Sequence, residues 1–531
     1  MINRDVRLKQ LASIAQTAMW ILVMFHPVSS ANAQAVAKDD KAANAFTPVT
    51  DGGLGSSATE EELNRESVLV TQRSMAVWQV DAAPEPQPAM RYRFWPSADS
   101  LQSGSGHPML LKVIVEIKIR PEATKEINEL SNGSLSTPEA VDSARKLLKS
   151  LDYQISLLRA MAFCRDMRWE GGPWRGRVDG PDAYLFQLGE IQESRLIARL
   201  LMLKARVHLI DRNFDAACNT ILIGFRLSFL VGQGDSVIQN LVSVAISAMM
   251  RALIEEMIQT PGSPNLYWAL LSVPTPLVSM REPFEQELAG ILRAFPDLAQ
   301  ARSAGWTEEE ARQRWTRAVT DLAKVSDERM TDLSGLGILQ ALDTSLYVEL
   351  ARSRLRAAGV TEEELLKLAP SAIVMTDTTM ELQRRSDELM KSTLLPGRAR
   401  RTYILAHSLA LNEWARQVEN ERTTSGASLF LSVLSPNIGQ AKTAEDRQPT
   451  VLRRLATLEA VRMHVATHNG AVPLTLNELS PVPALHAFDT ETPFEYRIEN
   501  AGEQPTLVLS GEIAGYEAAR HLRFQFRKND K

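Results

Sequence analysis

Residues 185–210, LFQLGEIQESRLIARLLMLKARVHLI, and residues 214–231, FDAACNTILIGFRLSFLV, are separated only by the polar turn Asp211-Arg212-Asn213. Apolar residues dominate one face of each stretch, which predicts two long amphipathic helices. Two helices joined by so short a turn form an antiparallel hairpin. This hairpin makes the expected fold class mainly α. The side chains expected to be buried where the helices meet are Leu203, Phe214, Ala217 and Phe225.

The helical pattern continues on both sides of the hairpin. Residues 143–167 carry leucines and isoleucines at spacings of three and four, which line up on one helix face. A third long helix is predicted at residues 235–258, because it stops before Pro261-Gly262. We therefore expect an α-helical body over residues 137–439. Its further helices are expected at residues 276–295, 307–325, 344–357, 372–391 and 396–424.

Small residues lie beside a large one around the hairpin turn. They are Ala205, Ala216 and Ala217, next to Phe214. This arrangement resembles a tetratricopeptide hairpin, in which small residues let two helices approach closely. The pattern does not recur at the usual period, so the resemblance covers one or two hairpins. It implies a concave groove that receives a peptide or a partner protein.

Residues 1–33 have the parts of an export signal. A basic region from Arg4 to Lys9 precedes an apolar region at residues 11–25 and the small-x-small site Ala31-Asn32-Ala33. The apolar region is shorter than the roughly 20 residues that span a bilayer. We expect cleavage before Gln34 and export to the periplasm, the cell envelope or the medium. The alternative is an uncleaved membrane anchor.

The next region is mixed. Residues 34–57 are small, polar and Gly-rich, which is typical of a flexible linker. Residues 58–136 form an N-terminal mixed region. In it, apolar residues seven apart predict a helix at 58–80, and the alternation of MRYRFW at 90–95 predicts an extended segment. The apolar run at 110–119 fits a strand or a helix.

The C-terminal part changes character. Residues 440–451 are polar and lack apolar periodicity, which predicts a linker. Residues 452–531 predict a small α+β module, with a helix laid across a sheet and about 80 residues in total, enough for a marginally stable unit. The alternative is that this segment folds only against the helical body. The expected helix is 452–468, and the expected strands are 494–498, 506–510 and 522–526.

Composition limits the classes of partner. Apolar residues make up 44% of the chain and charged residues 23%, the balance of a globular protein with a core. The formal net charge is −5 and becomes more negative if the basic export signal is removed. We therefore expect no nucleic-acid partner, and contact with a membrane only through an uncleaved signal.

The chain contains only two cysteines, Cys164 and Cys218. In an oxidising compartment they could pair. We favour two buried free thiols, because free cysteine is among the most buried residue types. No G-x-S-x-G, G-x-G-x-x-G, Walker A or C-x-x-C motif occurs, so the sequence predicts no cofactor.

Two histidines are candidate metal ligands. His464 and His468 are four apart on a predicted helix, so they share a face and could bind one metal ion. His486 and Asp489 follow within reach of a folded-back strand. No Glu follows His464 as a metallohydrolase helix would need. We favour the alternative of two ordinary histidines at a solvated helix end.

Carboxylates and aromatic rings gather around a Gly171-Gly172 turn before the first long helix. These residues are Asp166, Trp169, Glu170 and Trp174. Carboxylates beside aromatic rings can form a sugar-binding or acid/base site. Aromatic packing beneath the helical hairpin explains the same residues.

Three short blocks stand out in sequence order. They are residues 90–94 (MRYRF), the block from Phe214 through residues 265–270 (NLYWAL), and residues 493–497 (PFEYR). Together they resemble a family of uncharacterised exported proteins of planctomycete bacteria, and the resemblance implies no reaction. Residues 455–479 are similar to the region after the helix in type II secretion pseudopilins, although this copy lies at the C-terminus and lacks the N-terminal membrane helix.

Three functions fit these features, and whether the chain is an enzyme stays open. The absence of catalytic motifs favours a non-catalytic scaffold or a peptide- or protein-binding protein of the bacterial cell envelope. The second function is a hydrolase acting on an envelope polymer, through carboxylates at residues 166–182 or through His464 and His468. The third is an accessory of a secretion or pilus-like assembly, acting through residues 452–531.

Overall fold

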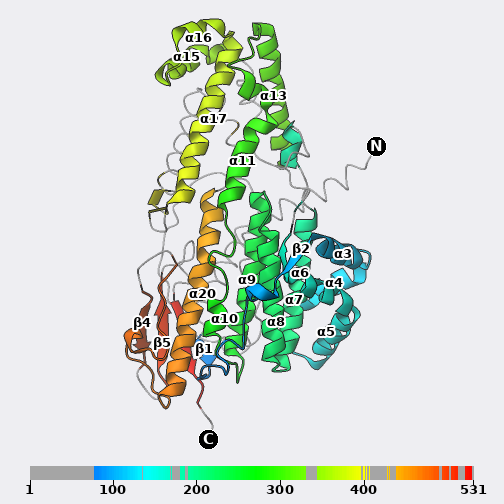
Figure 1. Ribbon diagram of the computed structural model, residues 1–531, viewed down its shortest axis with the longest axis vertical. Coiled ribbons are helices and arrows are strands. Elements are labelled where there is room, and N and C mark those ends of the chain that lie inside the picture. Colours follow the sequence, from blue (N-terminus) through cyan, green and yellow to red (C-terminus); the bar gives the residue numbers. More distant parts are fainter. Residues whose placement is uncertain are drawn as a thin grey trace, which may run out of the picture.

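The computed structural model is a mainly helical, elongated structure with a small sheet near one end (Figure 1). The expected export signal and linker at residues 1–57 lie outside the described residues, as does most of the helix expected at 396–424. These expectations stay predictions. The structure describes residues 77–528 apart from residues 134, 168, 170–179, 186–188, 330–343, 396–398, 401, 404–405, 407–426, 428–429, 431–437, 489–492, 501–503 and 512–520.

Three long central helices confirm the predicted hairpin and the helix that follows it. The turn places Arg212 at a positive φ of 54°. The Asn213 side chain accepts a hydrogen bond from the Ala216 amide and so caps the second helix. The polar turn residues therefore end one helix and begin the next. The helices are α7 (Gly189–Ile210), α8 (Phe214–Val231) and α9 (Val237–Gln259).

These helices pack closely. A Cβ added at Gly224 of α8 would lie 1.9 Å from the Met250 sulfur of α9, so a larger residue there would require the Met250 side chain to move. Phe214 is half-buried rather than buried, because it begins α8 beside the exposed turn. The tetratricopeptide-like repeats are not confirmed. Three expected core residues are fully buried: Leu203, Ala217 and Phe225.

α8 and α9 are long and apolar enough to cross a membrane, judged by length and composition alone. Within the protein, 72% of the α8 window and 78% of the α9 window are buried. A helix that is apolar on most sides suits the core of a large protein as well as a membrane. Burial against neighbouring helices therefore accounts for their apolar content.

Four shorter helices lie beside the hairpin (Figure 1). The segment 110–119 is helical, and the helix expected at 143–167 is divided in two near Leu151. Residues 90–95 form an irregular loop instead of the expected extended segment. The helices are α3 (His107–Lys118), α4 (Pro121–Asn132), α5 (Pro138–Ser150) and α6 (Asp152–Ala162), and β2 (Gln102–Ser105) pairs in parallel with β3 (Cys164–Asp166).

Several helices that follow α9 in the sequence extend away from the sheet, toward the top of Figure 1. The segment α15–α16 lies at the far end, where Thr361 and Glu364 form a capping box that starts α16. The four helices expected at residues 276–295, 307–325, 344–357 and 372–391 are confirmed with shifted ends, as α11 (Arg281–Ala294), α13 (Glu308–Arg329), α15 (Val348–Ala357) and α17 (Pro370–Leu394). Three short helices in this part were not predicted: α10 (Tyr267–Leu271), α12 (Pro296–Gln300) and α16 (Glu362–Lys367).

The segment 440–451 is helical and not a linker. It belongs to α20 (Ile438–Thr467), a single long helix. Glu445 pairs with Lys442 and accepts the Met280 amide at 2.9 Å. Polar side chains can be buried here because they find partners inside the protein. The buried charged residues of this part of α20 include Lys442, Glu445 and Asp446.

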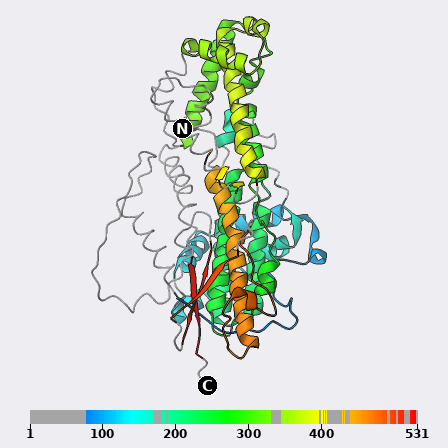
Figure 2. The same ribbon diagram turned by 90° about the vertical axis from the view of Figure 1, so that its left-hand side faces the viewer.

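The C-terminal strands form a sheet of order β1-β6-β5-β4. β1 (Val77–Val80) pairs in parallel with β6, so the last four residues of the helix expected at 58–80 form a strand instead. Residues 58–76 lie outside the described residues, and a helix there stays a prediction. α20 runs beside the sheet (Figure 2). Leu507 and Phe524 of the sheet belong to the same hydrophobic core as Phe225 of α8, so residues 452–531 share a core with the helical body. The three expected strands are confirmed as β4 (Glu495–Glu499), β5 (Thr506–Ser510) and β6 (His521–Phe526).

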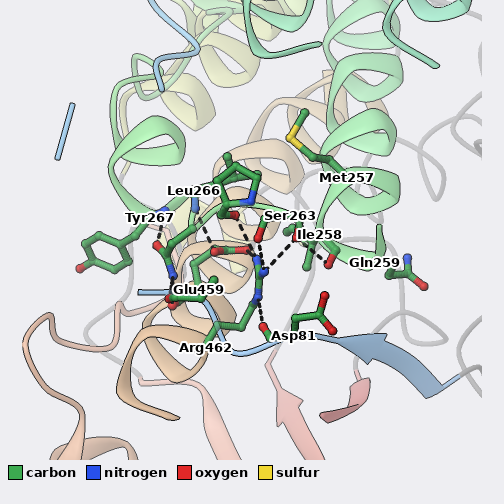
Figure 3. Close-up of polar contacts among 12 residues, drawn as sticks. Asp81, Met257, Ile258, Gln259, Ser263, Leu266, Tyr267, Glu459 and Arg462 are labelled. Carbon is green, nitrogen blue, oxygen red and sulfur yellow. Dashed lines mark hydrogen bonds and ion pairs between the residues drawn. The ribbon is translucent and has the colours of Figure 1, made fainter. Parts of the chain in front are cut away.

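A buried ion pair joins α20 to two segments remote in sequence (Figure 3). The Glu459 and Arg462 side chains are 0% exposed and lie 2.6 Å apart. Arg462 also donates to the carbonyl oxygens of Asp81 at 2.7 Å and Ser263 at 2.9 Å, and Glu459 accepts the Leu266 amide at 2.9 Å. Burial raises the pKa of Glu459, and the charge of Arg462 opposes that shift. The cluster fixes the end of β1 and the α9–α10 connection to α20.

Candidate functional site

A surface pocket of about 270 Å³ lies where the loop after β1 meets the start of α8. Its walls come from the loop at residues 90–100, from Phe163 after α6, and from residues 215–222 in the first turns of α8. Charged, aromatic and amide groups meet in this small space. The charged, aromatic and amide side chains of the lining include Arg91, Tyr92, Arg93, Trp95, Asp215 and Asn219.

Two aromatic side chains anchor the loop. Phe94 is fully buried, its ring centroid lies 6.1 Å from that of Phe225, and its amide donates to Ser272 Oγ at 3.1 Å. Trp95 packs edge-on against Phe229 with centroids 5.2 Å apart. Phe94 therefore points inward, whereas Arg91 and Arg93, on either side of Tyr92, are exposed at the surface.

Arg226 is a buried residue that contacts two aromatic rings at the pocket. Its guanidinium lies 4.7 Å from the Trp95 ring centroid and 4.9 Å from that of Phe229. It donates to the carbonyl oxygens of Ala162 at 2.8 Å and Cys164 at 2.5 Å. Burial lowers the pKa of Arg226 to about 10, so it stays protonated at neutral pH. Arg226 thus ties Trp95 to the end of α6.

The charged groups of the lining are not balanced. Arg91 binds Asp215 through two hydrogen bonds, Nε to Oδ1 at 3.2 Å and Nη2 to Oδ2 at 2.8 Å. Asp215 lies in the first turn of α8, where a carboxylate is favoured by the helix dipole. Arg93 donates through Nε to the Met90 carbonyl at 3.3 Å, and no carboxylate in the described part of the chain forms an ion pair with it. One positive charge is therefore left over.

The lining offers binding groups instead of a nucleophile with a base. Burial raises the pKa of the Cys218 thiol far above its usual value, so the thiol stays protonated. Burial also raises the pKa of Tyr92. Asp215 is the one carboxylate among the described lining residues, and Arg91 engages it. Among the described lining residues, no nucleophile lies beside a general base.

The histidine pair predicted from sequence is adjacent in space. The rings of His464 and His468 stack with centroids 3.9 Å apart, and His468 Nδ1 lies 2.9 Å from the His464 carbonyl oxygen. Burial lowers the pKa of His464, and the charge of His468 adds to this effect. Within the described residues, no group of three His, Cys, Asp or Glu side chains could hold a metal ion. His486 forms a β-bridge with Pro493, and Asp489 lies outside the described residues.

The proposed carboxylate–aromatic site is only partly described. Trp169 is buried, donates through Nε1 to the Leu230 carbonyl at 3.0 Å, and lies with its centroid 4.9 Å from the His107 ring. Its role is packing beneath the hairpin. The Asp166 carbonyl accepts the Gly106 amide at 3.0 Å at the end of β3. Glu170 and Trp174 lie outside the described residues.

Cys164 and Cys218 are both buried and unpaired, as we favoured from sequence. Sequence reasoning missed the pocket, although it singled out residues 90–95 as an alternating segment. The meeting of that segment with α8 joins residues more than a hundred positions apart, as the Arg91–Asp215 pair shows. No local pattern carries that information.

Comparisons with protein-family models, with curated proteins and with solved structures find no match for this chain. The resemblance to exported planctomycete proteins, carried by residues 90–94, 265–270 and 493–497, therefore stays a prediction.

Proposed function

We propose that the protein is an exported, non-catalytic binding protein of the bacterial cell envelope. It would hold a peptide, or a segment of a partner protein, in the pocket between residues 90–100 and α8. The observation that carries this proposal is a pocket with a fixed aromatic floor, a surplus arginine at its rim and no nucleophile–base pair. The proposed binding site is the pocket at the start of α8, and not the tetratricopeptide-like groove that the hairpin led us to expect.

The size of the pocket favours a short contact. Its volume of about 270 Å³ is below the range typical of drug-sized ligands. One or two residues of an extended chain fit such a space better than a cofactor does. The rigid floor formed by Trp95, Phe229 and Arg226 lowers the entropic cost of binding, because these groups are already ordered.

The two alternatives have less support. A hydrolase acting through residues 166–182 would need free carboxylates beside accessible aromatic rings, whereas Trp169 is buried in packing. A secretion accessory acting through residues 452–531 would need a module free to engage partners, whereas its sheet shares the core of the helical body. No observation in the described residues specifically favours either alternative.

Site-specific photo-crosslinking tests the proposed pocket. A benzophenone amino acid replaces Asn219, an exposed lining residue, in cells that make the full chain. A matched control carries it at Lys146, an exposed residue on α5. We expect a discrete adduct from position 219 and none from position 146. Equal labelling at both positions, or no adduct at 219, would refute binding at the pocket.

Export is tested separately by sequencing the N-terminus of envelope material. We expect the mature chain to begin near Gln34, after the small-x-small site at residues 31–33. A chain that starts at Met1 in the envelope would show an uncleaved anchor. Recovery of the full-length chain from the cytosol would refute export.

A further inference from the structure

We propose that the pocket selects ligands by a carboxylate group, which Arg93 binds while Asp215 holds Arg91 in place. This inference rests on the proposed function, since it names the chemistry of the ligand for the same pocket. It depends on three features: the surplus charge of the lining, the anchoring of Arg93, and the apolar surfaces beside it.

The surplus charge belongs to Arg93. Arg91 and Asp215 neutralise one another through their two hydrogen bonds. Arg93 contributes to the lowered pKa of Asp99, but the Ser97 hydroxyl is the larger cause of that shift and no ion pair joins the two side chains. A planar guanidinium with unused N–H groups matches the two oxygens of a carboxylate.

Arg93 is held before a ligand arrives. Its Nε donates to the Met90 carbonyl, and the next residue, Phe94, is fully buried with its amide bound to Ser272. This leaves few backbone arrangements for the loop. Because the backbone beside Arg93 is already fixed, binding a carboxylate orders mainly the Arg93 side chain, which lowers the entropic cost of binding.

The rest of the lining sets the surroundings of that carboxylate. Tyr92, Trp95, Phe163 and Leu222 offer apolar surface, and the Asn219 amide can bond to a peptide group. A carboxylate next to an apolar residue occurs at the C-terminus of a peptide and at an Asp or Glu side chain within one. The shared chemistry is the carboxylate, and the experiment distinguishes its two sources.

The test uses immobilised full-length protein and three sets of random-sequence heptapeptides. One set has a free C-terminal carboxylate and lacks Asp and Glu, the second contains Asp and Glu but ends in an amide, and the third has no carboxylate. Retained peptides are eluted and quantified by mass spectrometry. We expect at least one carboxylate set to be retained roughly ten-fold more than the third set. The set that is retained identifies the source.

Variants assign the selection to Arg93. Arg93→Gln should abolish the preference for carboxylates, whereas Arg93→Lys should keep part of it. Arg120→Gln removes an exposed arginine outside the pocket and should change nothing. Asp215→Asn frees Arg91 and should increase retention of carboxylate peptides, because the net charge of the lining rises.

The possible failures are distinct. If all three sets are retained equally and Asn219→Arg abolishes their retention, the pocket binds peptides without selecting carboxylates, and only this inference is wrong. A carboxylate preference that survives Arg93→Gln would also overturn it. If no set is retained, peptide binding at the pocket is wrong and the inference fails with it.

Discussion

Arg462 and Arg93 are the same kind of side chain in opposite situations. Arg462 is fully buried, pairs with Glu459 and donates to carbonyl groups of remote segments. Arg93 is exposed, donates to one carbonyl of its own loop and has no ion-pair partner among the described residues. A buried charge needs protein partners, whereas water satisfies an exposed one until a ligand replaces it. The comparison separates arginines that hold the fold from one that is available for binding.

Two other groups lie between these extremes. Arg226 is buried and bonded, yet it also forms the floor of the pocket. Asp377 is buried beside Arg354, but a single hydrogen bond of 3.3 Å joins them. Substitutions at four of these positions should distinguish residues that stabilise the fold from residues that bind a ligand. They follow in order of decreasing expected effect on stability.

Arg462→Met should have the largest effect. It leaves the Glu459 carboxylate buried without its counter-charge, which costs about 3–5 kcal/mol in the free energy of unfolding. The double variant Glu459→Gln/Arg462→Met removes both charges and should recover part of the loss. Urea denaturation of the three proteins measures both effects. An unchanged midpoint for Arg462→Met would show that the ion pair does not hold the three segments together.

Asp377 should give the protein a pH-dependent stability. Burial, opposed by Arg354, raises the pKa of Asp377 from 3.8 to about 6. Between these values the folded state binds more protons than the unfolded state, so stability falls as the pH rises from about 4 to 6, by at most about 3 kcal/mol. Asp377→Asn should flatten that part of the curve. The same slope in wild type and variant would assign it to another group.

Arg226→Met should have an intermediate effect. It leaves the carbonyl oxygens of Ala162 and Cys164 without a donor, at a cost of about 1–3 kcal/mol. Because Trp95 loses its cation partner, peptide retention should weaken as well. Thermal melting and peptide retention are measured on the same preparation. If the variant loses stability but retains peptides as well as the wild type does, Arg226 does not contribute to peptide binding.

Arg93→Gln should change stability by less than about 0.5 kcal/mol, since Arg93 is exposed and loses only one long hydrogen bond to the Met90 carbonyl. Its melting temperature should equal that of the wild type, while carboxylate selection disappears. Arg93 would then differ from Arg462 in both measurements. A clear fall in melting temperature would mean that Arg93 stabilises the loop, and the separation drawn between the two arginines would fail.

Local patterns predicted the parts of the fold that local interactions specify. The hairpin followed from apolar periodicity and the turn at residues 211–213, and the three C-terminal strands followed from alternation. β1 was missed because it is four residues long and gains its structure by pairing with β6, at the other end of the chain. Residues 58–80 alone give no sign that Val77–Val80 pairs with a strand at the other end of the chain.

The segment 440–451 shows the other kind of error. Its polar composition is typical of a linker, yet Glu445 is buried because Lys442 and the Met280 amide bind it. Composition cannot indicate such partners when one of them lies far away in the sequence. The pocket escaped prediction for the same reason, since Arg91 and Asp215 meet only in the folded chain.

Hydrogen–deuterium exchange locates the bound peptide on the protein. The full-length protein is compared with and without the peptides that it retains. We expect added protection at residues 90–100 and 215–222, which line the pocket, and none at residues 263–266 or 459–462, which form the buried ion-pair cluster. Protection confined to another part of the surface, with the pocket segments unchanged, would contradict peptide binding at the pocket.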